Sequence, residues 1–442
     1  MRRTKVLLLL TLLLSVLVPI SGCHAATEAA ASNALDAYIH APDASYQWKK
    51  VSSSKTADVL SLTSQTWQGH VWKHNLTIAK PSRNEFPGTA LLLINVDGGN
   101  DGERLLGMLA NGTGCMVVGL SAVPNQPLYD GKKEDALIAY TFQKFMETGD
   151  QTWPLLLPMT KSVTAAMDAV QDYSKSTDAP IEKFIVGGAS KRGWTTWLTG
   201  AEDKRVIGIV PMVYDNLNLP KQLPHQLEML GSYSSQIGDY TKLDLPHQLA
   251  TPHGMELVKI VDPYFYRDRL TMPKLIINGS NDPYWTVDSL NLYYNDLAGA
   301  KNVFYIPNAG HKLNMTDDAG NINISGAFYL LGTIQGWARI VAAGKTPPVV
   351  DLKVTTTAEG KRFITSVAGG TTGALYVAKS VTKDFRQSTW TPVVMKKVDG
   401  HFEADVKTPE SGYVAVFAQI VLPGTPGLPM RLSTPMTVWG AE

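Results

Sequence analysis

The hydrophobic pattern of the chain changes along its length, and each part predicts a different kind of structure. Between residues 83 and 345, short apolar runs alternate with segments of helical spacing. Runs that are apolar at consecutive positions are typical of strands buried on both faces, as in a parallel sheet. We expect such strands at residues 90–96, 116–121, 184–188, 206–213, 274–278 and 303–306, and helices at 103–110, 136–148 and 159–174.

Two flanking regions have the alternating pattern of antiparallel strands. Residues 46–79 alternate between apolar and polar side chains and predict strands that begin the sheet. After residues 342–348, seven short alternating segments follow. They predict an antiparallel β-sandwich of immunoglobulin-like type at residues 347–442, behind an α/β domain at residues 34–346.

One part of the α/β domain lacks the alternation of strand and helix. Residues 216–270 instead carry many prolines, histidines and aromatic residues. We expect this segment to form a lid inserted after a strand. His225, His247 and His253 lie in it, but no nearby cysteine or carboxylate spacing suggests a metal site, so we expect neither a metal nor another cofactor.

The N-terminal segment predicts export. Basic residues in the first five positions precede an apolar run from Val6 to Ile20 that is short for a membrane span. We expect residues 1–22 to be a signal peptide of lipoprotein type, because residues 20–23 match a lipobox that ends at Cys23. Lipidation of Cys23 would make the protein a periplasmic or outer-membrane lipoprotein, anchored to a membrane of the cell envelope. The alternative is ordinary cleavage near residues 24–26, which would release a soluble periplasmic protein.

Composition restricts the class of partner. The 442 residues are 44% hydrophobic and 18% charged, and the formal net charge is +1. This balance fits a secreted globular protein and argues against a nucleic-acid partner. It leaves the oligomeric state unknown.

The strongest chemical signal is at residues 184–194. An apolar strand ends in Gly187 and Gly188, Ser190 follows, and Gly193 lies at the start of a predicted helix. A sharp strand-to-helix corner with small flanking residues exposes a nucleophilic serine. The usual spacing places glycine two residues after the serine, where this chain has Arg192. An ordinary glycine-rich loop is therefore the alternative interpretation.

Two later segments supply a base and an acid in the order that such a serine requires. Asp282 follows the strand at 274–278, and His311 follows the strand at 303–306. A histidine removes the serine proton, and a carboxylate fixes the tautomer of the imidazole. Taken singly, each residue also fits an ordinary turn or surface loop. Asp215, after the strand at 206–213, is the alternative acid.

Hydrolysis also needs donors for the oxyanion and residues that bind the substrate. The backbone N–H of Lys191 is one expected donor, and Gly98 or Gly99 is the other, although their loop also fits an ordinary turn. Arg192 would either attract a substrate carboxylate or form an ion pair inside the fold. The candidate substrate-binding residues are Arg192, Tyr233, Tyr284 and Trp285.

These motifs resemble a known family. The string Gly-Gly-Ala-Ser-Lys-Arg-Gly-Trp at residues 187–194, with residues 201–206 and 278–282, resembles the PhoPQ-activated pathogenicity-related proteins, and the resemblance extends over residues 35–440. The serine spacing is also similar to that of glucuronoyl and acetyl-xylan esterases. The resemblance implies an α/β-hydrolase fold. It further implies a bacterial envelope protein controlled by a virulence regulator and connected with antimicrobial-peptide resistance.

The sequence therefore predicts a secreted serine hydrolase that acts on an ester. The nucleophile, base and oxyanion donors of a serine peptidase are the same, so a peptide substrate stays open. A non-catalytic protein that binds or sequesters a ligand on a hydrolase scaffold is the further alternative. Nothing in the chain identifies the physiological substrate.

Overall fold

The computed structural model describes residues 33–95, 100–316 and 323–441. The predicted signal peptide, its lipidation site Cys23, the alternative cleavage site and the glycines Gly98 and Gly99 lie outside these ranges. No helix within them is both long and apolar enough to cross a bilayer.

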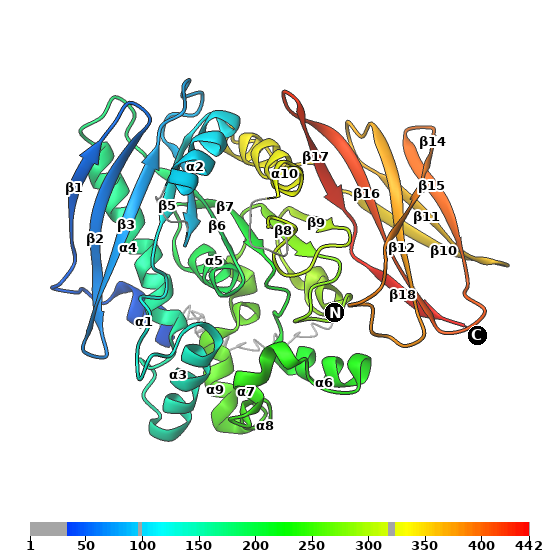
Figure 1. The fold of residues 1–442 in the computed structure, drawn as a ribbon, viewed down its shortest axis with the longest axis horizontal. Coiled ribbons are helices and arrows are strands. Elements are labelled where there is room, and N and C mark those ends of the chain that lie inside the picture. The colour runs from blue at the N-terminus through cyan, green and yellow to red at the C-terminus, as the bar shows by residue number, and fades with distance from the viewer. Residues whose placement is uncertain (1–32, 96–99, 317–322, 442) are drawn as a thin grey trace, which may run out of the picture. The chain divides into compact units, whose positions relative to one another are not determined.

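A large mixed sheet forms the centre of the α/β region (Figure 1). Its strands lie in the order β1-β2-β3-β5-β4-β6-β7-β8-β9. The first three strands and the pairing of β3 with β5 are antiparallel, and the pairs from β5 to β9 are parallel. The strands are β1 (Gln47–Ser53), β2 (Ala57–Trp67), β3 (His70–Ala79), β4 (Thr89–Ile94), β5 (Met116–Leu120), β6 (Lys183–Ala189), β7 (Val206–Met212), β8 (Lys274–Gly279) and β9 (Lys301–Ile306).

Helices cover both faces of this sheet, which explains the continuous apolar runs. Ile185 belongs to the same buried cluster as Trp337 of α10, whereas its neighbour Val186 belongs to the cluster on the opposite face, with Trp197 of α5. The α-helices are α1 (Ala34–His40), α2 (Asn100–Thr113), α3 (Glu134–Thr148), α4 (Leu156–Ser174), α5 (Lys191–Glu202), α6 (Leu219–Leu230), α7 (Gly238–Thr241), α8 (Leu245–Gln248), α9 (Pro252–Val261) and α10 (Ile324–Ala342). This arrangement confirms the predicted α/β-hydrolase fold class.

The segment predicted as a lid is helical. It contains α6 to α9 and the short 3-10 helices η1 (Ser235–Ile237) and η2 (Pro263–Arg269), all between β7 and β8. Two more 3-10 helices, η3 (Ser289–Leu292) and η4 (Tyr294–Asp296), follow β8. The lid helices lie at the end of the sheet where the parallel strands finish (Figure 1).

The C-terminal strands form two antiparallel sheets, as the alternating pattern predicted. One has the order β10-β11-β15-β14, and the other has the order β17-β16-β12-β13 with β18 paired to β16. Phe363 and Leu375, one from each sheet, belong to the same buried cluster. The strands are β10 (Asp351–Thr357), β11 (Gly360–Ser366), β12 (Thr372–Ser380), β13 (Thr391–Val394), β14 (Lys396–Val398), β15 (His401–Lys407), β16 (Tyr413–Thr425), β17 (Leu428–Ser433) and β18 (Thr437–Gly440).

Two details differ from the sequence pattern. The segment predicted as one strand at 391–396 is two strands on different sheets, separated at the buried Met395. The second C-terminal sheet also continues the central sheet, because Ser433 of β17 pairs with Val303 of β9. This pairing covers an edge strand that would otherwise present unpaired backbone groups.

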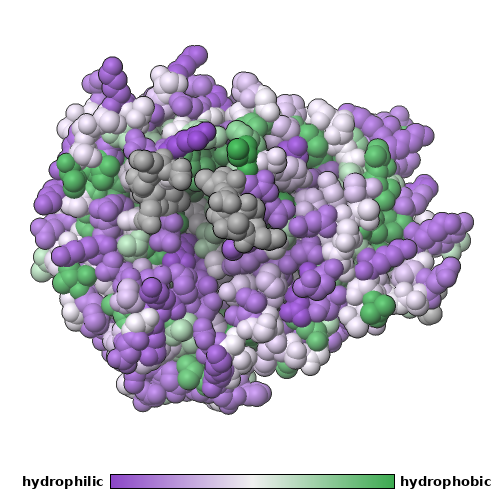
Figure 2. All heavy atoms as spheres, in the orientation of Figure 1, coloured by the Kyte–Doolittle hydropathy of each residue, from purple (hydrophilic) through white to green (hydrophobic). Residues whose placement is uncertain are grey.

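The molecular face in Figure 2 is mainly hydrophilic, with hydrophobic residues scattered over it. The most exposed large apolar residues are Val381 and Val394, both in the C-terminal part of the chain. Most large apolar side chains are instead buried in the two cores that flank the sheet.

The packing of α5 against β6 and β7 depends on two glycines. A Cβ atom at Gly188 would lie 2.7 Å from the Arg192 carbonyl oxygen, and one at Gly193 would lie 2.7 Å from the Met212 carbonyl oxygen. Both distances are too short for a real side chain. In the usual motif, the glycine lies two residues after the serine. Here Gly193, three residues after it, allows the close approach of the helix, so Arg192 can stand at the second position.

We predict that Gly193→Ala lowers the free energy of unfolding by about 1–3 kcal/mol, because the added methyl group must displace backbone atoms. Gly107→Ala is the matched control, since Gly107 also lies in a helix but a Cβ atom there meets nothing within 4 Å. The control should be neutral or stabilising by up to about 1 kcal/mol. Urea denaturation of the purified variants measures both changes, and equal stabilities would contradict the prediction.

Candidate active site

Ser190 lies at the corner between β6 and α5, in a strained backbone conformation. Its φ is 58° and its ψ is −125°, outside the regions that L-residues commonly adopt. Its backbone N–H donates to the Met212 carbonyl at the end of β7, at 2.9 Å. The corner thus fixes the serine at the carboxyl end of the sheet.

Three side chains that follow three different strands meet at this corner. His311 Nε2 lies 2.9 Å from Ser190 Oγ, and His311 Nδ1 lies 2.8 Å from Asp282 Oδ2. With a proton on Nδ1, the imidazole donates to the carboxylate and accepts from the serine hydroxyl. The ring of Tyr284 packs on the imidazole with their centres 4.3 Å apart. The structure therefore brings together the three residues that the sequence suggested as nucleophile, acid and base.

Asp215, the alternative acid, is hydrogen-bonded to a different residue. Its Oδ1 accepts a hydrogen bond from the Tyr293 hydroxyl at 2.6 Å. Burial raises the pKa of Asp215 from its ordinary value of 3.8 to about 7, and the nearby charge of Asp282 acts in the same direction. The geometry pairs His311 with Asp282 and gives Asp215 a tyrosine partner.

The basic residues after the serine are held by two acids at the start of α3. Arg192 Nη1 and Nη2 each lie 2.7 Å from a Glu134 oxygen, and Arg192 Nε donates to the Val123 carbonyl at 2.6 Å. Lys191 Nζ lies 2.7 Å from Asp135 Oδ2. Arg192 thus forms an ion pair inside the fold, the second of the two roles that the sequence left open.

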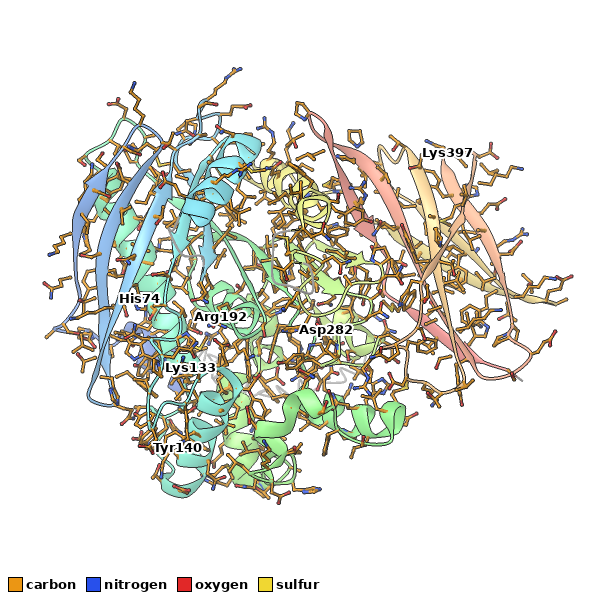
Figure 3. All side chains as sticks on the ribbon, viewed as in Figure 1. His74, Lys133, Tyr140, Arg192, Asp282 and Lys397 are labelled. Carbon is orange, nitrogen blue, oxygen red and sulfur yellow. The ribbon has the colours of Figure 1, made fainter. Side chains whose placement is uncertain are left out.

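An apolar hollow opens beside Ser190, between α3, α5 and the lid. Its lining includes Tyr284 and Trp285, as expected, and also Trp194 and Tyr214. Arg192 and Tyr233 are not part of this lining. Figure 3 shows Arg192 and Asp282 near the end of the central sheet that faces the lid helices.

Sequence reasoning missed Glu134, Asp135, Trp194 and Tyr214. Trp194 and Tyr214 lie close to predicted strands, and their aromatic character was the available signal. Glu134 and Asp135 lie about 56 residues before their basic partners, and no local pattern connects the two segments. Their role is visible only once α3 and α5 are placed side by side.

The loops that carry the acid and the base are held by a C-terminal segment. Asn281, next to Asp282, donates to the carbonyls of Arg386 and Ser388 at 3.1 and 2.7 Å. Asn308, three residues before His311, donates to the Trp390 carbonyl at 2.9 Å and accepts from its N–H at 2.7 Å. The segment between β12 and β13 therefore contributes to the position of both loops.

One of the two expected oxyanion donors lies at the same corner. The backbone N–H of Lys191 is the first of α5, and N–H groups in the first turn of a helix have no intrahelical partner.

In the part of the chain that the structure describes, no group of three His, Cys, Asp or Glu side chains is arranged to hold a metal ion.

Comparison with known proteins identifies the family. A family model described as PhoPQ-activated pathogenicity-related protein matches residues 35–386. The chain belongs to this family. A curated relative, autocrine proliferation repressor protein A of Dictyostelium discoideum, is 39% identical to this chain over 307 residues. That match covers 64% of this chain and 62% of the relative, so the chain spans less than two thirds of the relative's length.

Solved structures with some similarity are mainly esterases. Acetyl xylan esterase 1 from Thermoanaerobacterium is 18% identical, with a TM-score of 0.44 over 63% of this chain and 86% of the esterase. A glucuronoyl esterase from Solibacter usitatus is 8% identical, with a TM-score of 0.40 over 63% of this chain and 86% of its own.

The raised pKa of Asp215 predicts a pH-dependent stability. The folded protein keeps this proton up to about pH 7, whereas the unfolded chain releases it near 3.8. The Asp215 carboxyl therefore contributes up to ~4 kcal/mol to the free energy of unfolding at pH values below its unfolded pKa. This contribution is lost as pH rises through its folded pKa. Asp215→Asn lacks this term, so the variant should gain stability relative to the native protein as pH rises from about 4 to about 7.

Urea denaturation of both proteins at several pH values across this window measures the difference. Asp296→Asn, at the surface carboxylate that accepts from the Tyr264 hydroxyl, is a control for general effects of removing a charge. A constant stability difference between Asp215→Asn and the native protein would contradict the prediction.

Proposed function

We propose that this protein is a serine hydrolase that cleaves carboxylic esters through an acyl-enzyme. The observation that carries the proposal is the continuous hydrogen-bonded chain from Ser190 Oγ through His311 to Asp282, next to an apolar hollow. The strained backbone of Ser190 adds support, because strain of this kind is concentrated at functional sites.

In the proposed reaction, His311 Nε2 takes the proton of Ser190 as Oγ attacks the ester carbonyl. Asp282 holds the Nδ1 proton and stabilises the imidazolium. The N–H of Lys191 stabilises the oxyanion, and Gly98 or Gly99 is the proposed second donor. The imidazolium then protonates the leaving alcohol. A water molecule, activated by His311, hydrolyses the acyl-enzyme and restores the serine.

The proposal extends to the location of the protein. The lipobox at Cys23 supports a lipid-anchored protein of the cell envelope, and membership of the PhoPQ-activated family supports a contribution to antimicrobial-peptide resistance. A small ester is the proposed substrate, with a peptide as the alternative.

A non-catalytic role is the second candidate, and the name of the curated relative favours it. That protein is named as a repressor of proliferation, which describes a signal and not a reaction. A protein that acts by binding would keep its function without Ser190.

We predict that a fluorophosphonate probe labels the mature protein at Ser190. Labelling requires an activated hydroxyl, which the chain through His311 supplies at Ser190. Mass spectrometry of the adduct locates the site, and Ser190→Ala is the control that should not be labelled. An unlabelled native protein with a folded circular dichroism spectrum would favour the binding role.

We also predict that Asp282→Asn lowers kcat for any ester that the native protein cleaves by about 10³-fold or more, because the imidazole loses its orienting carboxylate. Asp215→Asn is the matched variant and should lower kcat by less than about tenfold. Steady-state kinetics of the two variants measures the contrast. The reverse order would assign the role of the acid to Asp215.

A further inference from the structure

The hollow beside Ser190 has walls that are mainly apolar. Phe142 of α3, Trp194 of α5, and Leu223, Ile237 and Leu249 of the lid line it. The aromatic side chains support one another: the rings of Trp194 and Tyr214 stack with their centres 4.9 Å apart, and Phe142 meets Trp194 edge-on at 5.9 Å. Such a wall contributes contact area and little hydrogen bonding.

The hollow is also narrow. Its cavity volume is only about 70 Å³, within a total empty space of about 760 Å³ that includes its open mouth. A slim aliphatic chain or a single flat ring fits such a space. A branched or sugar-like group has a wider cross-section.

The charged groups in the lining neutralise each other. Lys191 and Asp135 form a close pair, and their side chains are only 12% and 14% exposed. The other two oxygen contacts of Asp135 come from the hydroxyls of Tyr240 and Tyr284, at 3.0 and 3.2 Å. An additional charge placed here would find one opposite charge and one like charge at similar distance.

Two of the three amide side chains of the lining are occupied as well. Gln222 donates to the carbonyls of Leu217 and Ser289, and Gln226 donates to the Tyr284 carbonyl. A charged group that entered the hollow would therefore lose its water without gaining a counter-charge among the described residues, which is strongly unfavourable.

We propose that the hollow binds the acyl group of the substrate and selects acyl groups that are uncharged, apolar and slim. This inference rests on the proposed esterase function and narrows it. It excludes acyl groups that end in a carboxylate or an ammonium, and with them substrates whose free amino group lies next to the scissile carbonyl.

The test compares 4-nitrophenyl esters of the same chain length: hexanoate, 6-aminohexanoate and the mono-ester of adipic acid. The native protein should cleave the neutral ester with a kcat/KM about a hundredfold above either charged ester. Asp135→Asn removes the nearer of the two carboxylates beside Lys191 and should improve the adipate ester relative to hexanoate by about tenfold. Equal kcat/KM values for the three esters would overturn the proposal.

A pair of lid variants tests the location of the acyl group. Leu223→Trp fills the hollow and should lower the ratio of hexanoate to acetate cleavage by about tenfold or more. Leu227→Trp is the matched control, because Leu227 lies one turn further along α6, is 40% exposed and is not part of the lining. An unchanged ratio in Leu223→Trp would place the acyl group elsewhere.

A binding measurement separates this inference from the proposed function. Calorimetry of the Ser190→Ala protein with hexanamide, 6-aminohexanamide and adipamic acid requires no turnover. Preferential binding of hexanamide supports the proposed selectivity even if the native protein cleaves no ester. Indifference among the three ligands, or no binding, overturns it even if Ser190 is an active nucleophile.

Discussion

The close approach of β6 to α5 at Ser190 is the constraint on which the site depends. Gly188 allows β6 to meet α5, and Gly193 allows α5 to meet the end of β7, with carbonyl oxygens where side chains would otherwise lie. Ser190 then takes a conformation that costs about 1–3 kcal/mol, which the buried strand and helix around it must offset. Since the two following residues are part of the same turn, the corner also directs Lys191 and Arg192 toward α3. The ion pairs with Glu134 and Asp135 thus attach one wall of the hollow to the nucleophile.

The C-terminal sheets are part of the same construction. Asn281 and Asn308 stand beside the proposed acid and base, and both bond to backbone groups between β12 and β13. Earlier in the same segment, Lys383 forms an ion pair with Glu228 of α6 at 3.0 Å. One loop of the C-terminal strands therefore contacts the acid loop, the base loop and the lid. Its position depends in turn on β17, which continues the central sheet through β9.

The sequence predicts those features that depend on local pattern. Ser190, Asp282 and His311 each follow a strand, and parallel strands bring their carboxyl ends to the same edge of a sheet, so their meeting follows from their order. The bond between Asn281 and Ser388 joins residues 107 positions apart, and no periodicity encodes it. The division of residues 391–396 between two sheets was also beyond prediction, because no glycine, proline, asparagine or aspartate stands at the break between Val394 and Lys396. Arg192 shows the same limit: its motif is visible, but its partner Glu134 is not.

The fate of the two basic residues changes how the serine motif is understood. In the sequence, Lys191 and Arg192 make the surroundings of the serine basic and suggest an anionic substrate. In the fold, each meets a carboxylate from α3, so the charge that the motif adds is cancelled where it would act. The remaining lining is apolar, and a medium of low polarity strengthens the interaction between His311 and Asp282. The neutralised basic pair and the mainly apolar lining therefore favour the same proposed chemistry, attack of Ser190 on an ester whose acyl group is uncharged.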